Sequence, residues 1–155
     1  MSYKVRVIQS AAKGVERFDG EANDCTVRAL ANAYGMPYKL AHKIMAKQGR
    51  KPKAGLHPME THKVLTRLGF SLQGVHGTTK KARFLAKALD CQPKAGITLA
   101  SLLSSIGLGR YVVTIRGHAL AIVDGKVLDY GNNLANSHVA TVYKLPEQHI
   151  LFDQQ

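Results

Sequence analysis

The sequence has only two cysteines, no tryptophan, and no apolar stretch that approaches the ~18 residues of a membrane span. A disulfide-stapled domain of this size would usually carry more than Cys25 and Cys91. The first eight residues lack the long apolar run of a signal peptide and instead predict a strand. Because two thiols without a secretion signal suit a reducing compartment, we expect a cytoplasmic protein.

Metal-ligand motifs are also missing. The chain has seven histidines, but none forms an HExxH pattern, and no CxxC pair occurs. His57 and His62 are five residues apart, so they would not share one face of a helix well. The sequence therefore predicts neither a metal site nor a cofactor.

Acidic residues are scarce. Ten Asp and Glu stand against 22 Lys and Arg, which gives a formal net charge of +12. Such an excess favours an anionic partner, either nucleic acid or an acidic protein, although a basic surface can also serve solubility alone. A basic patch is expected in the loop after the second predicted helix, at Lys47, Arg50, Lys51 and Lys53. A second basic run follows later, at Lys80, Lys81, Arg83 and Lys87.

Aromatic residues are few as well. The chain has six Tyr and four Phe, and no run interleaves them with Lys or Arg as a base-stacking surface would. Any nucleic acid would therefore be held mainly through its phosphates, with little base preference.

What the chain does have is enough apolar residues, 45%, for a core in one domain spanning residues 1–155. Apolar spacing, Pro and Gly predict helices at 25–34, from near Pro37 to Gly49, from Pro58 to Gly69, after Thr78 or Thr79, and from Thr98 to Gly107. Strands are expected at 3–9, 70–75, 111–115, 119–123, 126–130 and 139–145. Helices then dominate the first two thirds and an antiparallel sheet the last third, which is an α+β fold.

Cys25 lies where a thiolate would be stabilised. It follows Asp24, a good N-cap residue, and so occupies the first turn of a predicted helix. The unsatisfied N–H groups and the dipole at a helix start favour an anion, which predicts a nucleophile. The alternative is a small apolar residue packed at a helix start. Cys91 follows a helix end, lacks that dipole, and is predicted to be structural.

The hairpin around Asp124-Gly125 predicts a partner for this thiol. With these two residues as the turn, Val123 opposes Lys126, and the count continues to Leu120 opposite Asp129. His118 and Asp129 then lie on one face as diagonal neighbours, about 7–8 Å apart along the backbone. A carboxylate there would orient the imidazole as the third member of a triad. Asn132, Asn133 and Asp124 are the alternatives for that role. A further alternative is that His118 and Asp129 both face solvent and have no catalytic role.

An oxyanion hole needs hydrogen-bond donors beside the nucleophile. Two groups are candidates from their position in the sequence, the backbone N–H of Cys25 and the side chain of Asn23.

Two segments together resemble a known family. Residues 23–31 read NDCTVRALA, and residues 117–129 read GHALAIVDGKVLD. In this order they resemble the small papain-like cysteine peptidases, closest to the C39-like and bacteriophage-encoded members. The resemblance implies a papain-like fold with Cys25 as nucleophile, His118 as general base and Asp129 as orienting acid. It also implies a protein or peptide substrate, and a location in the host cytoplasm or the phage particle.

One position departs from the family pattern. Papain-like enzymes usually carry a Gln a few residues before the Cys as oxyanion donor, and Asp19 stands near that place here. An ionised Asp cannot donate a hydrogen bond, so Asn23 would have to substitute.

The sequence is compatible with two functions. One is a thiol hydrolase acting on a peptide, isopeptide or related acyl bond. The other is a non-catalytic basic module of the same fold, associated with nucleic acid or with the structure of a phage particle.

Overall fold

The fold is a mixed sheet with helices on both faces, seen here in a computed structural model that describes residues 7–8, 24–51, 57–128 and 136–147. The expected α+β class is confirmed. The elements follow the chain in the order β1 (Val7–Ile8), α2 (Cys25–Tyr34), α3 (Tyr38–Lys47), α4 (Pro58–Arg67), β2 (Ser71–Val75), α5 (Lys80–Ala88), α6 (Leu99–Ser105), β3 (Arg110–Ile115), β4 (His118–Val123), β5 (Lys126–Leu128) and β6 (Val139–Leu145).

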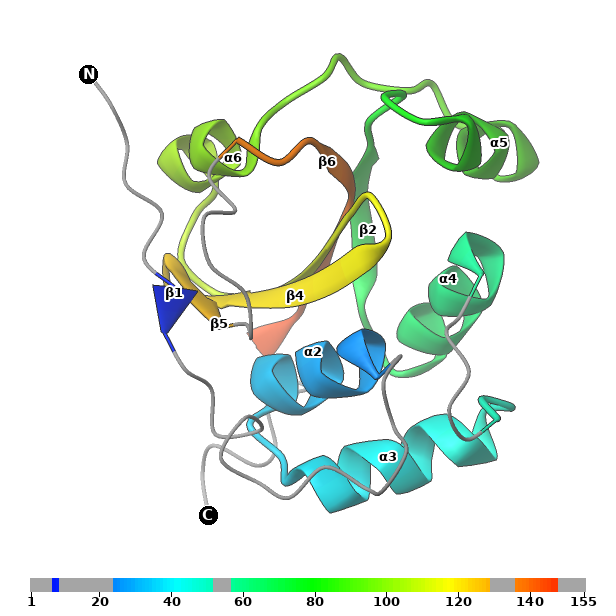
Figure 1. Cartoon of the computed structure of the whole chain (residues 1–155), viewed down its shortest axis with the longest axis vertical. Helices are drawn as coiled ribbons and strands as arrows, with labels where there is room; N and C mark the ends of the chain where they lie inside the picture. The colour runs from blue at the N-terminus through cyan, green and yellow to red at the C-terminus, as the bar shows by residue number, and fades with distance from the viewer. Residues whose placement is uncertain (1–6, 9–23, 52–56, 129–135, 148–155) are drawn as a thin grey trace.

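The sheet extends beyond the predicted C-terminal strands. Its order is β1-β5-β4-β3-β6-β2, and every neighbouring pair is antiparallel except β1 with β5. A strand from the middle of the chain, β2, therefore forms one edge, and β1 forms the other. Figure 1 shows α2 between the sheet and α3, with α6 on the opposite face.

The β4–β5 hairpin has the predicted turn and register. Val123 pairs with Lys126 and Ala121 with Leu128. Asp124 and Gly125 both have positive φ, 48° and 80°, as a two-residue turn that matches the twist of a hairpin requires. The Asp124 carboxylate also accepts a hydrogen bond of 2.9 Å from the N–H of Gly109, which ties this turn to the start of β3.

Helix ends follow the sequence signals in most places. Thr79 and Thr98 accept backbone hydrogen bonds as N-caps of α5 and α6, and Gly35 ends α2 with a φ of 76°. His57 caps α4 in a capping box with Glu60, which the sequence reading missed. Among the described residues no helix is long and apolar enough to cross a bilayer.

Helix α2 is buried on all sides. Every residue from Thr26 to Tyr34 is buried. Ala119 and Ala121 of β4 pack beneath it, and their small side chains let the helix axis come close to the strand. The other side of α2 is covered by α3, through residues such as Ala41 and Met45. The first turn of α2 is therefore held firmly against β4.

Asp24 stands at the N-cap position, but its side chain does not cap the helix, which corrects the prediction. The carboxylate turns inward instead. It accepts a hydrogen bond of 2.8 Å from the hydroxyl of Tyr38 and forms a 3.2 Å ion pair with Nε of Arg28. The Arg28 guanidinium also lies over the Tyr38 ring, 5.3 Å from its centre. Asp24 is 1% exposed, so this cluster locks the start of α2 to α3 inside the core.

We predict that Asp24→Ala lowers the free energy of unfolding by about 3–5 kcal/mol, because it takes the carboxylate away from a buried arginine. Tyr38→Phe removes one hydroxyl and should cost about 1–2 kcal/mol. Urea denaturation measures both. Asp24→Ala combined with Arg28→Met should recover part of the loss, since the buried charge is then gone. A loss below about 1 kcal/mol for Asp24→Ala would show that the cluster does not anchor the helix.

Candidate active site

Cys25 is the first residue of α2 and is partly buried. Its backbone N–H belongs to the helix turn whose N–H groups have no partner within the helix. The hydroxyl of the next residue, Thr26, forms a hydrogen bond with the Cys25 sulfur. The sulfur is thus placed at the positive end of a buried helix, as the sequence predicted, with a second polar contact that the sequence reading missed.

His118 is the first residue of β4, directly after the turn at Arg116 and Gly117. Gly117 has a φ of 70°, a left-handed conformation that glycine adopts without strain. The His118 side chain forms a hydrogen bond with the thiol of Cys25, and the backbone N–H of Ala119 donates to the same sulfur. Two residues 93 positions apart in the sequence therefore meet at one site, as predicted.

The environment favours the thiolate of Cys25. Burial alone would raise the pKa of this thiol. The hydrogen bonds from His118 and the N–H of Ala119, the charge of His118 and the Thr26 hydroxyl outweigh burial and hold the pKa below its ordinary value. The pair can therefore supply a thiolate nucleophile at lower pH than an ordinary thiol would, with an adjacent proton carrier.

Two of the other predicted site residues, Asp129 and Asn23, lie outside the described residues, as do the alternatives Asn132 and Asn133. The register on which the prediction of Asp129 rests is confirmed as far as the pair Ala121 and Leu128. Asp124, the remaining alternative for the orienting acid, is in the turn at the far end of β4 from His118 and is excluded from that role.

Cys91 lies in different surroundings. It follows α5, its N–H donates to the carbonyl of Ala86, and its side chain packs against the small apolar cluster around Val75 and Leu85. The pKa of Tyr143 is raised by burial and by the charge of Cys91. Tyr143 is also hydrogen-bonded, at 2.9 Å, to His62. Burial lowers the pKa of His62, so this second cysteine lies near a neutral His–Tyr pair.

The predicted basic patch is corrected at Arg50. That side chain is only 4% exposed, so it belongs to the interior rather than to a surface. Lys47 and Lys51 are exposed, and Lys53 lies outside the described residues. The backbone N–H of Arg50 donates to the carbonyl of Met45, so the chain turns back at the end of α3, which a count of basic residues along the sequence does not show.

A different basic surface is present on α3, and we call it the α3 stripe. Lys39, Lys43 and Lys47 follow one another at intervals of four residues, so they lie along one face, and all three are exposed. Helix α3 contains no acidic residue. Arg67 of α4 is bonded to Gln48 at 3.3 Å and brings a further positive charge beside the end of the stripe. The spacing of the lysines was visible in the sequence and could have predicted it.

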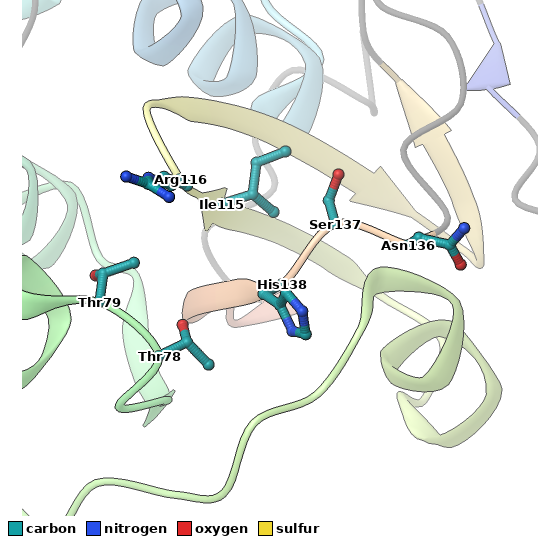
Figure 2. Close-up of a pocket in the computed structure, with 7 residues that line it drawn as sticks. All are labelled: Thr78, Thr79, Ile115, Arg116, Asn136, Ser137 and His138. Atoms are coloured by element: carbon teal, nitrogen blue, oxygen red, sulfur yellow. The ribbon is translucent and has the colours of Figure 1, made fainter.

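One cavity of about 250 Å³ opens at the same end of the sheet as His118. Figure 2 shows its lining, with Arg116 and Thr79 on one side, Asn136 on the other, and Ile115 and His138 between them. Ile115 is the register partner of His118 in the β3–β4 pair. The sequence reading missed this cavity, because its walls come from three separate segments of the chain. The lining residues are Thr78, Thr79, Ile115, Arg116, Asn136, Ser137 and His138.

Comparison with protein families, with characterised proteins and with solved structures finds no match for this chain. Within the described ranges, no three His, Cys, Asp or Glu side chains come together in a way that could hold a metal ion. The geometry around Cys25 and His118 is therefore the main indication of function.

We predict that iodoacetamide alkylates Cys25 faster than Cys91 at near-neutral pH, as read by peptide mass mapping. A thiol with a lowered pKa is already deprotonated at a pH where an ordinary thiol is not, so its reaction should begin at lower pH. In His118→Ala the hydrogen bond and the charge are lost, the pKa rises, and the rate near pH 7 should fall roughly tenfold or more. Preferential labelling of Cys91, or an unchanged pH profile in His118→Ala, would contradict this.

Proposed function

We propose that the protein is a thiol hydrolase of papain-like arrangement that cleaves a peptide, isopeptide or related acyl bond with Cys25 and His118. The observation that carries the proposal is the hydrogen bond between the Cys25 thiol and the His118 side chain at the start of a buried helix. The lowered pKa of that thiol supports the same role, since only the thiolate is strongly nucleophilic.

The proposed reaction proceeds through a thioester. The Cys25 thiolate adds to the carbonyl carbon, and the carbonyl electrons move to oxygen. The intermediate then collapses, the bond to the leaving amine breaks, and the protonated His118 gives its proton to that amine. His118 next takes a proton from water, which attacks the thioester, and the acid product leaves with the thiolate restored. Acyl transfer and deamidation share this intermediate.

The remaining roles follow the sequence. The N–H of Cys25 is positioned as one oxyanion donor, and we propose the side chain of Asn23 as the other, in place of the usual Gln. We propose Asp129 as the residue that orients His118, because the confirmed hairpin register leads toward it.

We predict that Cys25→Ala and His118→Ala each reduce peptide cleavage at least about 10³-fold, because nucleophile and base act as a unit. Asp129→Ala should cost less, since an orienting residue does not touch the reacting bond. A peptide library read by mass spectrometry provides the assay, and Cys91→Ser is the matched control that should keep activity. Cleavage that survives Cys25→Ala would rule out the proposed nucleophile.

A second function, a basic module bound to nucleic acid, is favoured by the α3 stripe. Three exposed lysines with no acidic residue on their helix form a linear array suited to a phosphate backbone. The net charge of +12 would draw such a partner in. This function needs no bond cleavage, and it is compatible with an active or an inactive Cys25.

We predict that the protein binds generic duplex DNA through the α3 stripe with a steep salt dependence. The logarithm of the binding constant should fall linearly with the logarithm of salt concentration, and each neutralised phosphate should add about 0.9 to the steepness of that slope. Replacing Lys39, Lys43 and Lys47 by Gln should make the slope shallower by about one for each lysine removed. Fluorescence anisotropy over a range of salt measures this. The matched control replaces three exposed lysines elsewhere, Lys80, Lys87 and Lys126. If both triple variants make the slope shallower by the same amount, only the net charge of the protein matters and the α3 stripe is not the binding surface.

A further inference from the structure

The cavity beside the β3–β4 turn is close to the proposed reaction site. Opposed residues in an antiparallel pair have Cα atoms about 4.5–5.5 Å apart and project from the same face. Ile115 lines the cavity and is opposed to His118, so the cavity opens on the face from which the His118 side chain projects. Arg116 lies in the turn that joins the two residues.

Ile115 belongs to the apolar cluster on the α6 side of the sheet, whereas Cys25 and α2 pack on the other side. His118, at the end of β4, contacts Cys25 and is opposed to Ile115, so it lies between the thiol and the cavity. A substrate held at Cys25 would reach the cavity around this end of the sheet.

The lining has the chemistry to bind an anion. Arg116 contributes an exposed guanidinium, and His138 and the hydroxyl of Ser137 contribute further polar groups. The Thr78 hydroxyl already donates to the carbonyl of Val139. None of the described residues that line the cavity is acidic.

A helix start adds to this positive potential. Thr79 is the N-cap of α5, and the first turn of that helix carries Lys80 and Lys81 and no acidic residue. The N–H groups of a first helical turn favour negative charge, so the helix and the guanidinium act on the same space. Ile115 supplies an apolar wall, against which the methylene groups of an Asp or Glu side chain can pack.

We propose that this cavity is a specificity subsite that takes an acidic side chain, Asp or Glu, of the peptide substrate beside the bond attacked by Cys25. This inference rests on the proposed thiol hydrolase function. The carboxylate pairs with the Arg116 guanidinium and accepts a hydrogen bond from the hydroxyl of Ser137. The methylene stem of the side chain lies against Ile115. The thiol chemistry of Cys25 alone would act on many acyl bonds. The subsite narrows the substrates to peptides with Asp or Glu beside the cleaved bond.

The first arm of the test measures cleavage. A position-scanning peptide library is prepared with Glu, Gln or Lys at each position, and the ratio of kcat/KM for Glu over Gln is measured. At the position that enters the subsite, the ratio should exceed unity by about tenfold or more, and Arg116→Gln should reduce it about tenfold. Arg116→Glu should reverse the preference toward Lys.

Lys126→Gln is the matched control. It removes one exposed positive charge at the opposite end of β4, so it should leave the Glu-to-Gln ratio unchanged. If Lys126→Gln and Arg116→Gln lower the ratio equally, the preference comes from net charge and the subsite is wrong. A ratio near one at every position in the wild-type protein would overturn the subsite as well.

The second arm measures binding without cleavage. Glu and Gln peptides are titrated into Cys25→Ala by isothermal calorimetry, with and without Arg116→Gln. In one outcome, the Glu peptide binds more tightly in a way that depends on Arg116 while the wild-type protein cleaves neither peptide. That outcome would support the subsite and contradict the hydrolase proposal. Cleavage by the wild-type protein with no preference for Glu in either arm keeps the hydrolase and rejects the subsite.

Discussion

The packing of α2 against β4 is the contact on which the proposed site depends. Ala119 and Ala121 are small, so a fully buried helix can lie directly over this strand. That approach brings the sulfur of Cys25 to the N–H of Ala119 and to the imidazole of His118. Larger side chains at the two alanines would push the helix away from the strand and separate the thiol from its hydrogen bonds.

The same packing explains why the start of α2 is built from charged residues. Charged side chains inside a protein need partners that replace water. Asp24, Arg28 and Tyr38 pair with one another there, and in doing so connect α2 to α3. Asp24 therefore holds the helix in place, while the neighbouring Cys25 is left facing the sheet.

The hairpin and most helix ends could be predicted from the sequence because local chemistry decides them. Asp124-Gly125 requires a tight turn, and that turn sets the register of His118 whatever surrounds it. Thr79, Thr98 and Gly35 act within one helical turn of their own position. The pairing of Cys25 with His118 was predictable for a related reason, since each residue carried a local signal of its setting.

The features that sequence reasoning missed depend on contacts between distant segments. A pattern along the chain cannot show that Asp24 contacts Tyr38, or that Arg50 is buried. The joining of β2 to β6 and the cavity around Arg116 likewise need the assembled sheet. The lysines of α3 are the exception, because their four-residue spacing was present in the sequence and only the helix bounds were needed to interpret it.

The proposed function depends most on the coupling between the Cys25 thiol and the His118 imidazole. A pH titration of thiolate absorbance in the ultraviolet measures this coupling directly. The titration is made on Cys91→Ser, so that only Cys25 contributes, and repeated with His118→Ala added. The account predicts a thiolate that forms below the ordinary thiol range and moves to higher pH when His118 is removed. A Cys25 thiol that titrates at the same, ordinary pH in both proteins would contradict it.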